Sequence, residues 1–321
     1  MNEFANLTPE FIFEAVEKAC GCGLTGHLRD LPSYINRVYE LEDEDGKRII
    51  AKFYRPGRWT QKALLEEHQY LYDCVESEIP VIPPIKFRNG QTLFQQKGQF
   101  MAAFPKLAGR EFEINTSEEW IRIGSLLGRL HAAGVKRKAD NRIHYHPEKS
   151  TLKDADHLIN KGFVPNHLTG RFKEIIGNII DFTLPLYNSV DYIRVHGDFH
   201  RGNILDRQDE GLMLIDFDDM MMAPAVQDFW LMLPNHLSQS MAEMEWMLEG
   251  YVQFMDFDKK SLTLIEPLRA MRIIYFLAWC STQVDDFQFK SKFPLWGTAN
   301  FWKNEIDDLT QQYHIMLDQE L

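Results

Sequence analysis

The sequence predicts an α+β protein of two lobes. The N-terminal lobe, residues 1–105, is expected to contain a small antiparallel sheet, and the larger C-terminal lobe, residues 106–321, is expected to be mostly helical. Strand-like segments bounded by turn residues fill much of the first lobe, whereas segments of helical apolar spacing dominate the second. Between them, Phe-Pro-Lys-Leu-Ala-Gly at residues 104–109 breaks both patterns, so we place the lobe boundary near residue 106.

Two helices are expected in the N-terminal lobe. Thr8 and Pro9 provide the N-cap and the first helical residue of a helix that ends at residues 21–23, which include two glycines. Thr60 begins a second helix. Helical spacing gives this helix a predicted inner stripe of Leu64, His68, Leu71 and Val75.

The strands of this lobe are predicted from β-rich runs between turn signals. The first strong pair, joined by a turn that contains Asp45 and Gly46, has a good hairpin signature. The predicted strands are residues 37–41, 48–54, 91–94 and 99–104.

The C-terminal lobe is predicted to be helical because apolar residues recur there at helical spacing. Thr116 and Glu119 form a capping-box pattern that begins a helix ending at Gly134. Further helical segments are predicted near residues 165–190, 225–233, 239–256, 261–284 and 299–318.

One stretch of this lobe carries a catalytic pattern. Residues 196–203 read His-Gly-Asp-Phe-His-Arg-Gly-Asn, so Asp198 precedes Asn203 by the Asp-x4-Asn spacing of a protein-kinase catalytic loop. Asp216 follows an apolar run at residues 212–215, which predicts a short strand with a carboxylate at its end. Each residue alone is as typical of a solvated turn, but the three in this order indicate one site.

Phosphoryl transfer is the chemistry that these side chains suit. Asp198 can orient an acceptor hydroxyl and take its proton, and we predict Asp198 and Asp216 as the catalytic carboxylates. Asn203 and Asp216 offer hard oxygen ligands, so they are the predicted ligands of a Mg²⁺ that bridges the phosphates of ATP.

Lys52 is the candidate phosphate-anchoring lysine. It lies in Ile-Ile-Ala-Lys-Phe, close to the Val-Ala-Ile-Lys of kinase strand three. On a strand it shares a face with Ile50, so its ammonium would point into the cleft toward the phosphates; the alternative is an exposed strand residue. Glu67 belongs to the inner stripe of the second helix and is better placed than Glu66 to pair with Lys52.

These motifs resemble the catalytic core of the kinases typified by aminoglycoside phosphotransferases and choline kinases, which share the protein-kinase fold. More narrowly, the chain is similar to the stress response kinase A family, bacterial cytoplasmic Ser/Thr protein kinases of that superfamily. The resemblance covers most of the chain and also includes residues 33–39, 51–59, 65–69, 224–230 and 265–272. It implies a two-lobed, protein-kinase-like fold.

The resemblance also implies roles for single residues. The chain lacks a Gly-x-Gly loop between its first strands, and by the resemblance the Ser33 hydroxyl would contact the nucleotide phosphates; the alternative is that Ser33 only shapes a turn. Backbone groups from Pro105 to Leu107 would read the adenine edge at the hinge. His196 would brace the catalytic loop as a neutral imidazole, and the carboxylate of Asp228 would accept backbone hydrogen bonds.

The function predicted by residues and resemblance together is a Mg-ATP-dependent serine/threonine protein kinase. Its role in the response to oxidative and envelope stress is implied by the resemblance alone. Two alternatives stay open: a kinase acting on a small alcohol such as an amino alcohol, a sugar or a drug, and an ATP-sensing pseudokinase that binds partners. The complete ordered set of catalytic groups favours an enzyme.

The composition of the chain excludes some classes of binding partner and indicates a cellular compartment. A formal net charge of -12 argues against a broad surface for nucleic acid or an anionic membrane, since both require clustered Lys and Arg. The chain has neither a signal-peptide pattern nor a long uninterrupted apolar stretch, and its four cysteines are scattered, as in a reducing compartment. We therefore expect a cytoplasmic protein with no nucleic-acid or membrane partner. The resemblance implies protein substrates with Ser or Thr acceptors, and we expect a monomer.

Overall fold

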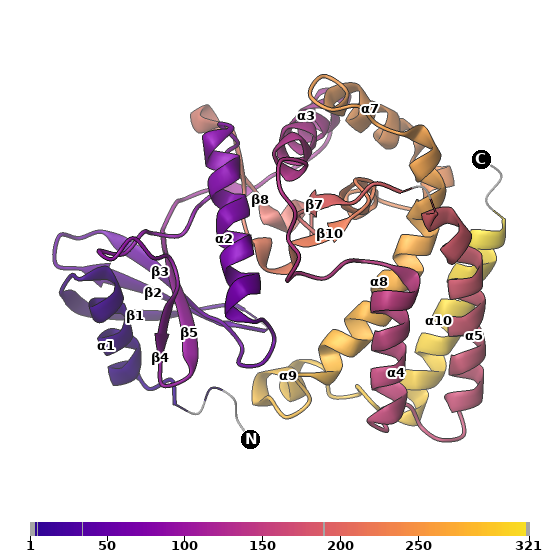
Figure 1. Ribbon diagram of the computed structural model, residues 1–321, viewed down its shortest axis with the longest axis horizontal. Coiled ribbons are helices and arrows are strands. Elements are labelled where there is room, and N and C mark those ends of the chain that lie inside the picture. Colours follow the sequence, from indigo (N-terminus) through magenta and orange to yellow (C-terminus); the bar gives the residue numbers. More distant parts are fainter. Residues whose placement is uncertain (1–3, 5, 34, 189, 319–321) are drawn as a thin grey trace. The chain divides into compact units, whose positions relative to one another are not determined.

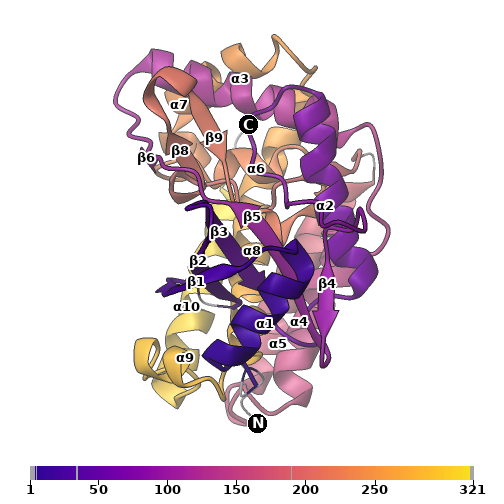
Figure 2. The ribbon, with the colours of Figure 1, turned by 90° about the vertical axis from the view of Figure 1, so that its left-hand side faces the viewer.

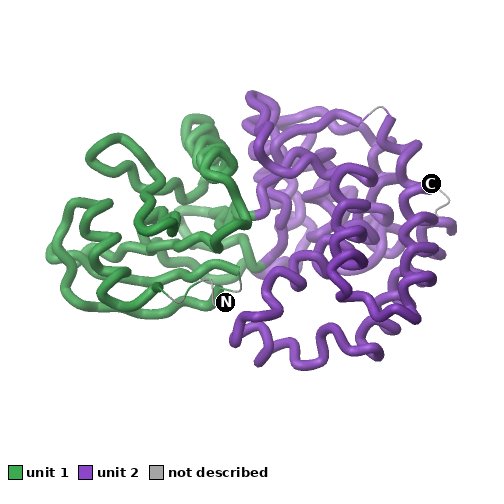
Figure 3. Tube along the Cα trace, turned by 60° about the horizontal axis from the view of Figure 1, so that its bottom comes forward, with its two compact units in different colours: residues 1–112, 202–218 green, residues 113–201, 219–321 purple. Residues whose placement is uncertain are grey.

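The structure, a computed structural model, describes residues 4, 6–33, 35–188 and 190–318. The chain forms two compact units: the first consists of residues 1–112 and 202–218, and the second of residues 113–201 and 219–321 (Figure 3). The chain thus returns once to the first unit. The functional division into residues 1–105 and 106–321 stays a prediction.

The first unit contains a five-stranded antiparallel sheet of order β1-β2-β3-β5-β4 (Figure 1). Its strands are β1 (Leu24–Leu31), β2 (Arg37–Asp43), β3 (Arg48–Phe53), β4 (Phe94–Gln96) and β5 (Gln99–Pro105). The β2–β3 hairpin is confirmed, and Gly46 in its turn has φ of 79°, a conformation that favours glycine.

The structure differs from the sequence predictions at two of these strands. β1 was not predicted, because this edge strand buries none of its side chains fully and therefore lacks a clear apolar alternation. The strand predicted at residues 91–94 begins only at Phe94, where pairing with Met101 of β5 begins.

Side-chain alternation gives the sheet two apolar faces. Met101 and Ala103 of β5 pack in one cluster with helix α1 (Pro9–Cys20), whereas Ala102 packs with Leu64 of helix α2 (Gln61–Glu76). Figure 2 shows α1 lying across its face of the sheet. Lys52 is paired with Ala102 and so belongs to the α2 face.

Both helices of this unit begin where the sequence predicts. The side-chain oxygens of Thr8 and Thr60 accept hydrogen bonds from the third helical residue of α1 and α2, and Gly21 ends α1 in a left-handed conformation with φ of 68°. The predicted inner stripe of α2 is buried except at Val75, which is 43% exposed. That part of the prediction was wrong because α2 ends one residue later, at Glu76, beyond the apolar cluster around Leu64.

A second, three-stranded sheet completes the first unit. Its order is β6-β8-β9, with β6 (Arg110–Glu111), β8 (Ile204–Asp206) and β9 (Leu212–Leu214) all antiparallel. The β8–β9 hairpin comes from the returning segment, and Leu214 N–H donates to the Pro80 carbonyl at 2.8 Å. This hairpin positions the residues discussed below.

The second unit is mostly helical, as predicted, and the α+β class is confirmed. The capping box is present, with Thr116 accepting from Glu119 N–H and the Glu119 carboxylate accepting from Thr116 N–H. Its helices are α3 (Ser117–Gly134), α4 (Leu152–Asn160), α5 (Thr169–Thr183), α6 (Gln227–Trp230), α7 (Met241–Tyr251), α8 (Ile265–Ser281), α9 (Phe287–Lys292) and α10 (Ala299–Leu317). Strands β7 (Ile193–Val195) and β10 (Met221–Ala223) pair antiparallel.

Two packing arrangements organise this unit. Helices α4, α5, α8 and α10 share one apolar cluster and lie side by side in Figure 1. Helices α3 and α7 approach through glycines: a Cβ on Gly124 would lie 1.9 Å from the Met247 carbonyl oxygen, and one on Gly250 would lie 2.0 Å from the Ile121 carbonyl oxygen. Larger residues at these positions would force the helices apart.

No helix within the described ranges is both long and apolar enough to cross a membrane.

Candidate functional site

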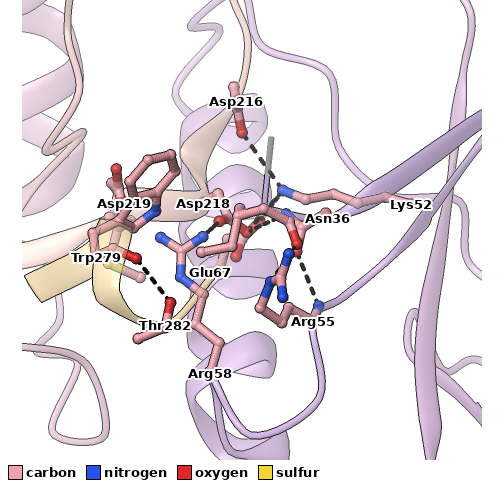
Figure 4. Close-up of polar contacts among 12 residues, drawn as sticks. Asn36, Lys52, Arg55, Arg58, Glu67, Asp216, Asp218, Asp219, Trp279 and Thr282 are labelled. Atoms are coloured by element: carbon pink, nitrogen blue, oxygen red, sulfur yellow. Dashed lines mark hydrogen bonds and ion pairs between the residues drawn. The ribbon is translucent and has the colours of Figure 1, made fainter. Parts of the chain in front are cut away.

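Lys52 lies on β3 and its ammonium is surrounded by carboxylates. Its Nζ lies 3.0 Å from Asp218 Oδ1, 3.5 Å from Asp216 Oδ1 and 3.8 Å from Glu67 Oε1 (Figure 4). Burial alone would lower the pKa of Lys52, but the charges of these three carboxylates together raise it well above its ordinary value. Lys52 is therefore a buried, charged ammonium.

Asn203 and Asp216 lie at one end of the β8–β9 hairpin. Ile204 pairs with Leu214, and beyond that pair the Ile215 N–H donates to the Asn203 carbonyl oxygen at 3.0 Å. Asp216 therefore directly follows the residue bonded to Asn203. It has φ of 60°, which a residue with a side chain adopts only at a cost, and such positions cluster at functional sites.

Asp218 makes a closer contact with Lys52 than Asp216 does. The Asn36 side-chain amide donates to Asp218 Oδ1 at 3.1 Å, and the Arg58 guanidinium pairs with Asp218 Oδ2 (Figure 4). The Asp218 side chain is only 8% exposed, compared with 56% for Asp216. Asp218 is thus held inside the first unit, whereas Asp216 offers an accessible carboxylate.

Ser33, Pro105 and Leu107 lie at strand ends of the first unit. Ser33 is half-buried in the segment between β1 and β2. Pro105 ends β5, and Leu107 follows in an irregular stretch after Lys106, whose N–H donates to the Arg48 carbonyl at 3.2 Å. The nucleotide contacts expected of these residues stay predictions.

Asp198 belongs to the second unit, where Arg272 of α8 binds its carboxylate. Arg272 Nη2 lies 2.7 Å from Asp198 Oδ1 and 3.7 Å from Asp219 Oδ2, while His200 Nε2 lies 3.3 Å from Asp198 Oδ2. The Tyr275 hydroxyl donates to Asp219 Oδ1 at 2.7 Å. Burial raises the pKa of Asp198, but the His200 hydrogen bond and the Arg272 charge outweigh it and hold the pKa below its ordinary value. Asp198 is therefore ionised at neutral pH.

A buried carboxylate supports the loop that carries Asp198. Asp228 accepts hydrogen bonds from the backbone N–H groups of His196, at 2.7 Å, and of Gly197, at 2.8 Å. Its Oδ2 also lies 3.1 Å from His131 Nε2 on α3, and both side chains are fully buried. His196 Nδ1 in turn accepts from the Asp198 N–H at 3.3 Å. The prediction that Asp228 accepts backbone hydrogen bonds is confirmed.

The predicted residues are divided between the units. The structure brings Lys52, Glu67 and Asp216 together in the first unit. Asn203 lies in the same unit, and its carbonyl oxygen accepts from the N–H of Ile215, the residue before Asp216. Asp198 lies in the second unit, on the loop that passes into the first unit between residues 201 and 202.

A metal at the hairpin end would have few protein ligands. Across the described parts of the chain, His, Cys, Asp and Glu form no group of three or more that could hold a metal ion. Mg²⁺ commonly takes one or two protein oxygens and completes its shell with phosphate oxygens and water. One carboxylate from Asp216 and one carboxamide oxygen from Asn203 fit that pattern.

The roles of Arg58, Asn36 and Arg272 were missed in the sequence. A signal for Arg272 was available: it lies four residues after Leu268 and three before Tyr275, both buried, so the guanidinium belongs to the inner face of α8. For Arg58 the signal is weaker, since an arginine after a Pro-Gly turn is usually solvated.

Comparison with known proteins gives close relatives over nearly the whole chain. Residues 27–256 match the phosphotransferase enzyme family. The chain is 35% identical over 319 residues to proteins named stress response kinase A from Shigella flexneri and from Escherichia coli K12, covering 99% of this chain and 96% of each relative. It is 34% identical over 315 residues to a protein of Salmonella typhimurium named serine/threonine protein kinase RdoA, covering 98% and 94% of the two chains.

Solved structures share the fold at lower identity. The amicoumacin kinase hAmiN, in complex with AMP-PNP, Ca²⁺ and Ami, superposes with a TM-score of 0.71 at 18% identity, covering 93% of each chain. A microcompartment-associated aminopropanol kinase superposes with a TM-score of 0.68 at 16% identity, covering 96% of each chain.

Proposed function

Since this chain belongs to the phosphotransferase enzyme family and, within it, to the stress response kinases, we propose that it is a Mg-ATP-dependent kinase that phosphorylates Ser or Thr hydroxyls of proteins. The observation that carries this proposal is the grouping of Lys52, Glu67 and Asp216, with Asn203 at the same hairpin end. The name of the relatives supports a role in a bacterial stress response.

In this proposal the first unit binds the nucleotide. Lys52 binds its phosphates, and Glu67, 1% exposed, keeps the ammonium on the α2 face of the sheet. Asn203 and Asp216 would hold Mg²⁺, which would supply positive charge for phosphoryl transfer. Ser33 contacts the phosphates, and the backbone from Pro105 to Leu107 contacts the adenine.

Asp198 of the second unit is the proposed base. It accepts the proton of the acceptor hydroxyl, whose oxygen forms a bond to the γ-phosphorus while the bond from that phosphorus to the β–γ bridging oxygen breaks and ADP leaves. The His200 hydrogen bond and the charge of Arg272 keep the carboxylate ionised for this step. Asp228 keeps the loop in place through the two backbone hydrogen bonds described above.

The proposal is tested with Asp198→Ala and Asp216→Asn in the full chain. Both variants should keep the folded far-UV signal of the wild type and lose nearly all transfer of the γ-phosphoryl from labelled ATP. Asp216→Asn should also lose the dependence of nucleotide binding on Mg²⁺. An Asp198→Ala protein that transfers phosphate at the wild-type rate contradicts the assigned role of Asp198.

The acceptor is tested separately, because the fold is shared with kinases of small molecules. The purified chain is incubated with labelled ATP and either a cell extract or a panel of amino alcohols and sugars. Label in Ser or Thr of protein bands supports the proposed acceptor. Rapid turnover with a small alcohol and no labelled protein would replace it.

A further inference from the structure

A buried cluster of charges surrounds Asp218 in the first unit. Lys52 Nζ and Asn36 Nδ2 lie 3.0 Å and 3.1 Å from Asp218 Oδ1, and the Arg58 guanidinium binds Oδ2 (Figure 4). The side chains of Lys52 and Arg58 are each 11% exposed and that of Asp218 is 8% exposed. One buried carboxylate therefore pairs with a buried ammonium and a largely buried guanidinium.

Arg58 reaches Asp218 from the turn after β3. Arg58 N–H donates to the Arg55 carbonyl at 3.3 Å across a turn that contains Gly57, whose φ is 79°. The turn is itself anchored: Arg55 Nε donates to the Ile35 carbonyl at 2.9 Å, and Arg55 N–H donates to Asn36 Oδ1 at 3.1 Å.

Asn36 connects this turn with Asp218. Its carboxamide oxygen accepts from Arg55, and its amide nitrogen donates to Asp218, so one buried side chain joins three segments distant in sequence. The Arg58 guanidinium also lies 5.2 Å from the centre of the Trp59 ring, which limits its freedom to leave. The turn and the Trp59 ring thus hold Arg58 next to Asp218.

In this arrangement the Asp218 carboxylate and the nucleotide phosphates compete for the Lys52 ammonium. In the proposed function Lys52 must bind nucleotide phosphates, yet Asp218 lies nearer to its ammonium than Asp216 or Glu67 does. A buried carboxylate that loses a cation is strongly destabilised unless another cation remains. Arg58 supplies that second cation.

We propose that Arg58 is a positioning residue that neutralises Asp218, so that Lys52 can exchange Asp218 for the phosphates of the nucleotide. This inference depends on the proposed function, because it assumes that Lys52 binds the nucleotide. Without the charge at position 58, Asp218 retains Lys52 and nucleotide binding weakens. Without the carboxylate at position 218, Arg58 no longer matters to Lys52.

The test is a double-mutant cycle on the dissociation constant of ATP in the presence of Mg²⁺, measured by calorimetry with the full chain. Arg58→Gln should raise Kd about tenfold, and Arg58→Lys, which keeps a cation, should stay near the wild type. Asp218→Asn should bind ATP at least as tightly as the wild type. In Arg58→Gln/Asp218→Asn, Kd should return to within about threefold of the Asp218→Asn value.

Arg88→Gln is the matched control, because Arg88 is exposed and donates to the Gly21 carbonyl on the same unit. If Arg58→Gln raises Kd for ATP by the same factor in the wild type and in Asp218→Asn, Arg58 acts without neutralising Asp218 and the inference is overturned. It is also overturned if Arg58→Gln leaves Kd unchanged in the wild type. If Arg58→Gln does not fold, weaker ATP binding by Asp218→Asn is enough to reject it. A wild-type chain that does not bind ATP would instead contradict the proposed function.

Discussion

Asp228→Ala is expected to destabilise the second unit and to abolish phosphoryl transfer. The substitution removes the acceptor of two buried backbone N–H groups, those of His196 and Gly197, and the partner of His131. A buried donor left unsatisfied costs roughly 1 to 3 kcal/mol, so the two backbone donors together cost about 2 to 6 kcal/mol. That is a large fraction of the roughly 5 to 15 kcal/mol by which folded proteins are stable.

Asp228→Asn keeps the volume of the side chain and removes only part of its hydrogen bonding, so it distinguishes lost hydrogen bonds from lost packing. Its carboxamide keeps one acceptor oxygen but presents an NH2 group where the second oxygen was. The free energy of unfolding should therefore fall by roughly half as much as in Asp228→Ala, about 1 to 3 kcal/mol. Phosphoryl transfer should fall further in Asp228→Ala than in Asp228→Asn, because these hydrogen bonds hold the backbone just before Asp198.

Urea unfolding followed by tryptophan fluorescence measures this effect. Six of the seven tryptophans lie in the second unit, so the signal reports mainly on it. The control is Asp307→Ala, which removes an exposed carboxylate paired with Arg171 and Lys303 and should leave the midpoint unchanged. The reasoning is refuted if Asp228→Ala unfolds at the same urea concentration as Asp307→Ala.

Three further outcomes are expected. Arg272→Gln removes the cation 2.7 Å from Asp198, so the pKa of Asp198 should rise and the acidic limb of the kcat/KM pH profile should move to higher pH; an unmoved limb would contradict the role of this ion pair. Burial raises the pKa of Asp154 to about 7, so the folded chain keeps a proton that the unfolded chain loses above about pH 4. Wild-type stability therefore falls as pH rises from about 4 to about 7. The Tm of Asp154→Asn should exceed that of the wild type between pH 4.5 and pH 8, but not below pH 4. Gly124→Ala places a Cβ 1.9 Å from a carbonyl oxygen of α7 and should cost about 1 to 3 kcal/mol or more in urea unfolding, whereas Gly177→Ala, with nothing within 4 Å of its Cβ, should stabilise α5 by about 1 kcal/mol.

Local patterns in the sequence predicted most elements well. Thr8, Thr60 and Thr116 begin helices because their hydroxyls satisfy backbone N–H groups that no helical turn can reach, and this depends only on neighbouring residues. The edge strand β1 was missed because it is half exposed on both faces, and an apolar period is the signal from which strands are recognised.

The candidate site was predictable only where its residues are close in sequence. The loop from Asp198 to Asn203 and the strand before Asp216 follow spacings that the chemistry requires, and Lys52 follows the alternation of its strand. Choosing Glu67 over Glu66 was possible because helical spacing identifies the inner face of α2, where Glu67 is buried.

Sequence by itself thus determined most of the helices, about half of the strands and the types of group available for phosphoryl transfer. Tertiary structure decided which charges meet. Arg58 pairs with Asp218 across 160 residues, and Arg272 with Asp198 across 74. Periodicity specifies the face of an element on which a side chain lies, but which distant face it will meet depends on packing of the whole unit, and only there does a buried charge acquire its partner.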